Sequence, residues 1–122
     1  MNNQEKRLAN RVDCSKLVYI RCIDCDGQVS QEILGHILNI SKNGLRVESP
    51  LPIDTEQILI STLDPEDRSV GVRSQIIYSQ KKKSSGFIIG IKFAAPADSC
   101  TNFIRAVAKA SRTPIRPQEQ SS

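Results

Sequence analysis

Apolar and polar residues alternate along most of this chain, and the alternation predicts a protein built from β-strands. The stretch 16–23 shows the pattern, because Val18 and Ile20 would face one side of a strand while Leu17 and Tyr19 face the other. β-Branched residues inside such stretches and turn-forming residues between them support this interpretation. On these grounds we expect strands at 16–23, 32–40, 45–49, 57–63, 69–79 and 87–93.

Turn signals separate the expected strands. Asp26-Gly27 favours a tight turn after the first strand, 64–67 favours a second turn, and 81–86 reads as a loop. The apolar pattern of the fifth strand breaks near Gln75, which indicates a β-bulge.

The last regular element is a helix expected at 100–110, where apolar residues recur every three or four positions. Phe103, Ile104 and Val107 share one face of this helix, and 96–99 supplies both a strand stop and a helix N-cap. Six strands followed by one helix predict an all-β fold with a C-terminal helix, namely a six-stranded antiparallel β-barrel. We expect the apolar face of the helix to plug one end of the barrel.

The chain of 122 residues is long enough for one hydrophobic core. We expect a single domain at 7–110, which includes an N-terminal arm at 7–12. We expect a flexible polar tail at 1–6 before this domain. The run 111–122 has no periodicity and is expected to be disordered.

Composition narrows the classes of partner. Hydrophobic residues at 39% and charged residues at 25% are typical of a soluble globular protein. The net charge of +4 attracts anions without identifying one, and an aromatic content of 4% argues against a binder that stacks the bases of a nucleic-acid polymer. No apolar run is long enough to span a membrane, and the polar start is no signal peptide. We therefore expect a cytoplasmic protein without membrane insertion.

The stretch 39–44 between two expected strands combines turn chemistry with polar side chains. Gly44 is able to adopt a positive φ, while Asn39 and Ser41 carry short side chains that bond to nearby backbone or to a bound ligand. Taken alone, this pattern fits an ordinary hairpin turn equally well.

Near the N-terminus, Arg7 and Arg11 stand four residues apart. The arginine side chain presents a planar fork of donors that suits phosphate and the O6/N7 edge of guanine, and its flat face stacks on bases. Such pairs are also common on solvated helix faces, so the spacing is informative only together with the second motif.

The combination of R-x-x-x-R and N-x-S-x-x-G resembles the signature of the PilZ domain family. Arg7 and Arg11 match the first half, and Asn39, Ser41 and Gly44 match the second.

A third likeness lies at 90–93, where Gly-Ile-Lys-Phe resembles the Gly-x-Arg/Lys-Phe pattern of the family's closing strand. The resemblance thus runs from about Arg7 to Ala110. It implies a small barrel of the split-barrel type and a receptor for the bacterial second messenger cyclic di-GMP.

The resemblance also implies a role for each motif residue. Arg7 and Arg11 would bind phosphate and the guanine O6/N7 edge, while Asn39 and Ser41 would meet the ligand from the other side on a turn held by Gly44. The family pattern admits Asn39 where Asp is more frequent. An amide has one acceptor oxygen and no charge, so its contact with guanine N–H groups is expected to be weaker than that of a carboxylate.

The function implied is that of a cytosolic receptor, without cofactor or catalysis, whose signal passes to a partner protein in trans to control motility, biofilm or secretion. One alternative is a module of the same fold that binds protein partners and no nucleotide. A basic nucleic-acid-binding barrel is a third class, which the few aromatics and modest charge disfavour.

Cys22 and Cys25 have the C-x-x-C spacing of a zinc half-site or a redox pair. A zinc site would need further ligands, for which Cys14, Cys100 and His36 remain. The pair precedes a turn and not a helix, so no helix dipole would lower a thiol pKa. We expect neither a metal site nor a catalytic residue, and we interpret His36 as a packed or half-exposed neutral imidazole.

Overall fold

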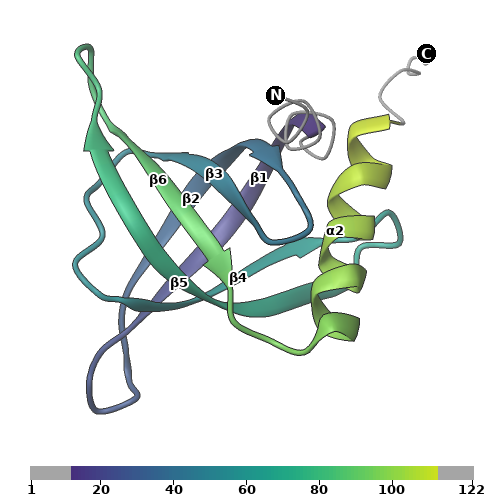
Figure 1. Ribbon diagram of the computed structural model, residues 1–122, viewed down its shortest axis with the longest axis horizontal. Helices are drawn as coiled ribbons and strands as arrows, with labels where there is room; N and C mark the ends of the chain where they lie inside the picture. Colours follow the sequence, from purple (N-terminus) through teal and green to yellow (C-terminus); the bar gives the residue numbers. More distant parts are fainter. Residues whose placement is uncertain (1–11, 113–122) are drawn as a thin grey trace, which may run out of the picture.

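The computed structural model describes residues 12–112 of the chain, which form six strands and one helix (Figure 1). The elements in chain order are β1 (Val12–Ile23), β2 (Val29–Ile40), β3 (Gly44–Ser49), β4 (Gln57–Leu63), β5 (Ser69–Lys81), β6 (Phe87–Phe93) and α2 (Ala97–Arg112). All six expected strands and the expected helix are therefore present.

The strands close into a barrel in the order β1-β2-β3-β6-β5-β4, with β4 pairing again with β1. Every neighbouring pair is antiparallel. The expected fold class, a six-stranded antiparallel barrel followed by a helix, is confirmed.

The β1–β2 hairpin is longer than its sequence pattern indicates, since β2 begins at Val29 and not at residue 32. The Asp24 carboxylate accepts hydrogen bonds from the backbone N–H groups of Asp26 and Gln28 at 3.0 and 2.9 Å, and Gly27 has a φ of 81°. This compact turn lets polar residues that follow it pair with β1 despite their low strand propensity.

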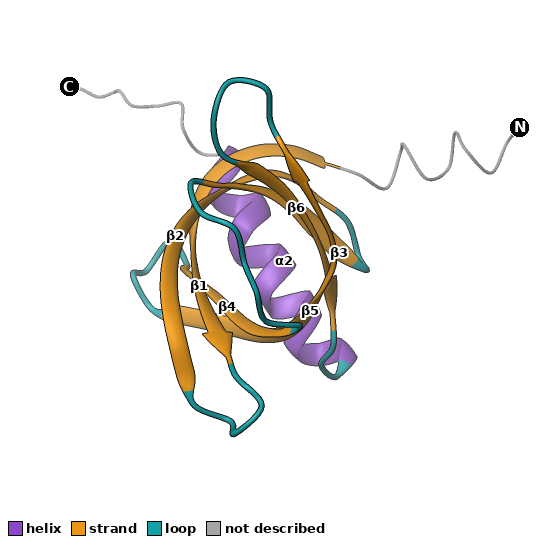
Figure 2. Cartoon of the chain, turned by 90° about the vertical axis from the view of Figure 1, so that its left-hand side faces the viewer, coloured by secondary structure: helices purple, strands orange, loops and turns teal. Residues whose placement is uncertain are grey.

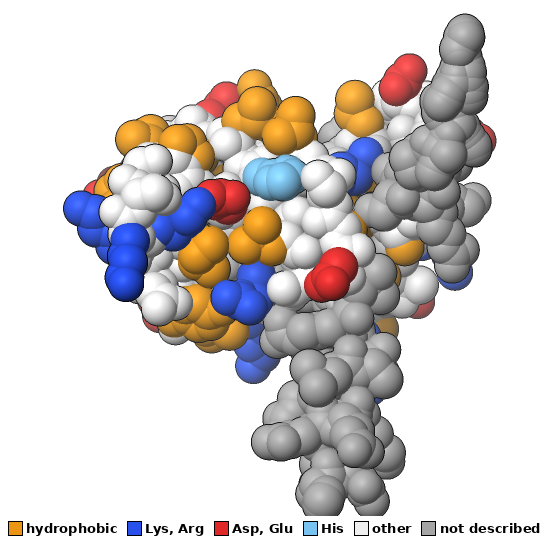
Figure 3. Space-filling model, turned by 90° about the horizontal axis from the view of Figure 1, so that it is seen from above, with side chains coloured by type: hydrophobic (Ala, Val, Ile, Leu, Met, Phe, Trp, Pro, Cys, Tyr) orange, Lys and Arg blue, Asp and Glu red, His pale blue; other side chains and the backbone are white. Residues whose placement is uncertain are grey.

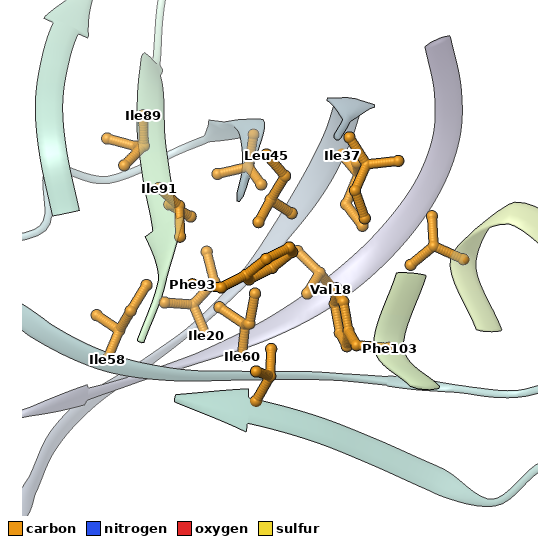
Figure 4. Packing of buried hydrophobic residues seen from close by; sticks show 14 of the residues in the cluster. Val18, Ile20, Ile37, Leu45, Ile58, Ile60, Ile89, Ile91, Phe93 and Phe103 are labelled. Carbon is orange, nitrogen blue, oxygen red and sulfur yellow. The ribbon is translucent and has the colours of Figure 1, made fainter. Parts of the chain in front are cut away.

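The interior of the barrel is filled by aliphatic side chains from all six strands (Figure 4). Phe93 at the end of β6 and Phe103 of α2 meet edge to face, with ring centroids 6.0 Å apart. Aromatic pairs favour this geometry. The pair joins the last strand to the helix inside one core.

Helix α2 lies across one end of the barrel and is visible through the ring of strands in Figure 2. Phe103 and Val107 are fully buried, whereas Arg105 is exposed, so the predicted plugging face is confirmed. The predicted start at residue 100 is wrong, because the helix begins at Ala97 and the Pro96 carbonyl accepts the Cys100 N–H at 3.2 Å. Proline is well suited to a helix start, where its missing N–H costs nothing.

Strand β5 carries the predicted irregularity, with a register shift between Ile76 and Tyr78. The shift places Tyr78 on the outer surface opposite Gly90 of β6. Within residues 12–112, no helix is both long and apolar enough to cross a membrane.

Candidate functional site

The turn between β2 and β3 is braced by Ser41. Its backbone N–H donates to the Gly44 carbonyl at 2.8 Å, its hydroxyl accepts the Asn43 N–H at 3.3 Å, and the same hydroxyl donates to the Gly44 carbonyl at 3.4 Å. The two side-chain bonds are long, so the hydroxyl keeps the capacity to bond elsewhere.

Gly44 is required by close packing. The expected positive φ is wrong, since among the described glycines only Gly27 and Gly86 have one. A Cβ atom on Gly44 would stand 2.0 Å from the carbonyl oxygen of Ile91 in β6. The glycine therefore permits β3 to approach β6 where the motif turn enters the sheet.

The same turn is tied to the closing strand by Asn43, whose carbonyl accepts the Phe93 N–H at 2.9 Å. Phe93 in turn packs against Phe103 of α2. The motif turn thus sits on a rigid part of the barrel, where core and helix hold it.

Arg7 and Arg11 lie outside the described residues. The residues that directly follow Arg11 are described: Val12 pairs with Ile40, and Asp13 pairs with Asn39. The segment that carries the two arginines is therefore joined to the barrel directly beside the motif turn.

A row of paired residues crosses five strands on the outer surface. Asp13 in β1 pairs with Asn39 in β2, Asn39 with Arg46 in β3, Arg46 with Gly90 in β6, and Gly90 with Tyr78 in β5. We call these five residues the transverse row. It brings the motif residue Asn39 into line with a cation and an aromatic ring.

The ring of Tyr78 covers Gly90. A Cβ atom on Gly90 would stand 2.2 Å from Tyr78 Cε2, so only glycine leaves room for the ring in this position. Tyr78 nevertheless remains 42% exposed. The pairing provides a flat aromatic surface over the sheet.

Beside the row lies a pocket of about 450 Å³. Arg46 and Lys92 line it, together with Tyr78 and the turn residues Ser41 and Gly44, and no acidic residue is among its described lining. The Arg46 Nε atom is enclosed and has no hydrogen-bond acceptor within the described part of the chain. An enclosed donor without an acceptor is costly, and an anionic ligand would satisfy it.

Comparison with known proteins identifies the fold family. The model of the family described as "PilZ domain" matches residues 5–108. The chain belongs to the PilZ domain family. No curated protein matches the sequence.

Two solved structures resemble this PilZ domain. The crystal structure of the PilZ domain of CeSA, from a cellulose-synthesizing bacterium, is 18% identical with a TM-score of 0.57, and the match covers 82% of this chain and 96% of that one. The Bacillus subtilis inhibitor of motility, MotI/DgrA, is 18% identical with a TM-score of 0.59, covering 87% of this chain and 51% of that one. The chain thus spans about half of the second protein, and at this identity both likenesses show the fold.

Sequence patterns missed two lining residues of this PilZ domain. Arg46 is one of several polar positions in an alternating strand. Tyr78 follows a β-bulge, and the exact position of that bulge determines on which side of the sheet the later side chains of β5 lie. The sequence singles out Lys92 only as part of the run 90–93. The one available signal was glycine at 90 in a strongly apolar strand, which indicates close approach by a neighbour.

The C-x-x-C pair is divided between two environments. Cys22 is buried on the inner face of β1, where burial raises the pKa of its thiol, and Cys25 is exposed in the following turn. His36 is half-buried on β2, and its Nε2 lies 2.8 Å from the Ser15 hydroxyl oxygen. No group of three potential metal ligands occurs among the described residues.

Proposed function

We propose that this PilZ domain is a receptor for cyclic di-GMP, which it binds over the transverse row and the adjoining pocket. The observation that carries the proposal is the pairing register, which aligns Asn39 of the family motif with Arg46 and Tyr78 on one surface. PilZ domains are binding and regulatory modules, and this arrangement supports binding.

The charges of the pocket suit the ligand, while Asp13 places one carboxylate at the β1 end of the transverse row. Cyclic di-GMP carries two phosphates, and Arg46 and Lys92 supply positive charge in a pocket with no described carboxylate. Arg7 and Arg11 would add two guanidinium groups from the segment that joins the barrel at Val12. Charge-assisted bonds to phosphate are about twice as strong as neutral ones.

The guanines have partners of the required kinds as well. The exposed face of Tyr78 offers stacking, which is sequence-tolerant because every base has a π-face. Asn39 supplies an amide acceptor for guanine N–H groups, and the Ser41 hydroxyl retains bonding capacity beside it. The pocket volume of about 450 Å³ falls within the usual range for small-molecule sites, roughly 300 to 1,000 Å³.

We infer that the bound state acts on a partner protein in trans, in the bacterial cytoplasm, in the control of motility or biofilm formation. The pairing of Val12 and Asp13 with Ile40 and Asn39 supports this inference, because a ligand bound there would alter the surface at the start of β1. The alternative, a PilZ module that binds only proteins, is decided by the test below.

Nuclear magnetic resonance titration of isotope-labelled protein with cyclic di-GMP tests the proposal and its location together. The amide signals of Gly44, Arg46, Gly90 and Lys92 are expected to shift, and that of Gly27 at the distant β1–β2 turn serves as the internal control. GTP and cyclic AMP should leave all signals in place. Absence of shifts with cyclic di-GMP, or shifts confined to the opposite side of the barrel, would reject the site.

A further inference from the structure

Four large apolar side chains stand exposed on the outer surface of β1, β2 and β4. The exposed fractions are 58% for Leu17, 45% for Tyr19, 51% for Leu34 and 50% for Leu63. Single exposed apolar residues are ordinary, but a contiguous group marks an interaction surface. Figure 3 shows hydrophobic side chains gathered beside the histidine on the barrel surface.

The four side chains are contiguous. Tyr19 pairs with Leu34 on one side and with Ser61 on the other, and the Leu17 carbonyl accepts the Thr62 hydroxyl at 3.1 Å. All four line one groove of about 640 Å³, which we call the β1 groove.

The charges along the β1 groove have one sign. Lys16 and Arg21 line it, and no carboxylate is among its described lining residues. Arg21 is ion-paired with Glu32, with 3.7 Å between Nε and Oε2, but its Nε has no hydrogen-bond acceptor within the described structure. The guanidinium group therefore retains capacity for a carboxylate at closer range.

The β1 groove and the candidate ligand site share strand β1. Ser15 and Lys16 line the groove, and Asp13, two residues before Ser15, belongs to the transverse row. A bulge between Asp13 and Lys16 separates the two surfaces. A molecule seated in the groove would thus contact the strand whose start lies at the ligand site.

We propose that the β1 groove docks an acidic amphipathic segment of the partner protein, with apolar side chains against Leu17, Tyr19 and Leu34 and carboxylates against Lys16 and Arg21. The proposal rests on the proposed function for its signalling role and names the surface and chemistry of the partner. A second copy of this chain is a poorer occupant. A symmetric dimer would bring each groove against itself, so that Lys16 and Arg21 of both copies would meet, with no carboxylate among the described residues that line either groove.

Selection from a display library of random peptides on the full chain tests the proposal. The enriched peptides are expected to combine apolar residues with an excess of Asp and Glu. Leu34→Asp should lower the affinity for the synthesised peptides about tenfold or more, because substitution of a central interface residue typically has an effect of this size. Arg21→Gln should weaken them less, and its effect should shrink at high salt. Leu51→Asp, at a side chain 47% exposed outside the groove, is the matched control and should bind like wild type.

The groove assignment is overturned if the selection enriches no peptides, or if it enriches basic or uncharged ones. It is also overturned if Leu34→Asp binds the selected peptides as tightly as wild type does. Dimerisation that Leu34→Asp abolishes would assign the groove to a second copy. Competition by peptides of residues 1–11 or 113–122 would assign it to the chain's own ends. Leu34→Ser, checked for an unchanged melting temperature, repeats the test should the aspartate variant fail to fold.

Nucleotide binding is measured separately on the same variants. Leu34→Asp and Arg21→Gln should retain the affinity of wild type for cyclic di-GMP, because neither residue lines the pocket beside the transverse row. If wild type binds acidic peptides in the groove but no nucleotide, the proposed function is rejected and the docking surface is supported. If wild type binds nucleotide but no peptide, the docking surface is rejected and the proposed function is supported.

Discussion

Gly44 lies so close to Ile91 that a Cβ atom on the glycine would stand 2.0 Å from the Ile91 carbonyl oxygen. This contact joins the start of β3 to β6 at the motif turn. The obstructing atom belongs to the backbone of β6, which pairs with β3 on one side and with β5 on the other, so it has little freedom to move away. Glycine at this position therefore sets how closely β3 approaches β6 at the motif turn.

Gly44→Ala is therefore expected to destabilise the fold by about 1 to 3 kcal/mol or more, the range for overpacked sites. Urea denaturation measures the loss. Gly71→Ala is the matched control, because a Cβ there meets nothing nearer than 3.3 Å. Equal losses in the two variants would show that the approach to Ile91 is not what requires glycine.

Tyr78→Ala is expected to weaken the binding of cyclic di-GMP by about 1 to 3 kcal/mol, the usual contribution of base stacking on an aromatic residue. Tyr78→Phe keeps the ring and should bind within a few-fold of wild type. Fluorescence or calorimetric titration of both variants measures the difference. A Phe variant as weak as the Ala variant would assign the effect to the hydroxyl and not to stacking.

Arg46→Ala is expected to lower the affinity for cyclic di-GMP by about one to two orders of magnitude, since a charge-assisted bond contributes roughly 1.5 to 3 kcal/mol. Folding should not suffer, because the change removes an enclosed donor that lacks an acceptor. Arg73→Ala, at an exposed arginine of β5 outside the pocket, should bind normally. Unchanged affinity in Arg46→Ala would remove Arg46 from the ligand site.

The pair of Glu48 and Lys82 predicts a pH dependence of stability. The Lys82 ammonium group hydrogen-bonds the Glu48 carboxylate and lowers the pKa of that carboxyl. A lowered folded-state pKa stabilises the fold above the carboxyl's ordinary pKa, and the contribution is lost as pH falls through the folded pKa.

The melting temperature of Lys82→Met should accordingly lie below that of wild type at neutral pH, and the difference should disappear at acid pH once Glu48 is protonated. Lys83→Met, at an exposed lysine of the same loop, is the control and should follow wild type throughout. A gap that persists unchanged in acid would assign the effect to packing of the Lys82 chain.

The sequence was sufficient for the strands and the helix because each buries one face. Val18 and Ile20 alternate with exposed neighbours, and Phe103 and Val107 recur at helical spacing, so periodicity identifies the elements. It does not identify their ends. Asp24 and Gln28 close the first hairpin through side-chain and backbone bonds that periodicity does not register.

The site was predictable only where residues are close in sequence. Asn39, Ser41 and Gly44 form a local motif, and their assignment as ligand residues stays a prediction, as does that of Arg7 and Arg11. Arg46, Gly90 and Tyr78 meet through the register of three strands, which a bulge next to Ile76 shifts. Because one residue of slip reverses the facing of a strand, alternation alone did not place Tyr78 outside.

Whether this PilZ domain is a cyclic di-GMP receptor that uses Arg7 and Arg11 is tested by isothermal titration of the purified protein with cyclic di-GMP, beside the Arg7→Ala/Arg11→Ala double variant. GTP and cyclic AMP serve as control ligands. Wild type is expected to bind with micromolar or tighter affinity and the double variant not at all, with the stoichiometry read from the same curve. No heat with wild type at ligand concentrations far above micromolar would contradict the receptor function, and normal affinity in the double variant would contradict the binding role of Arg7 and Arg11.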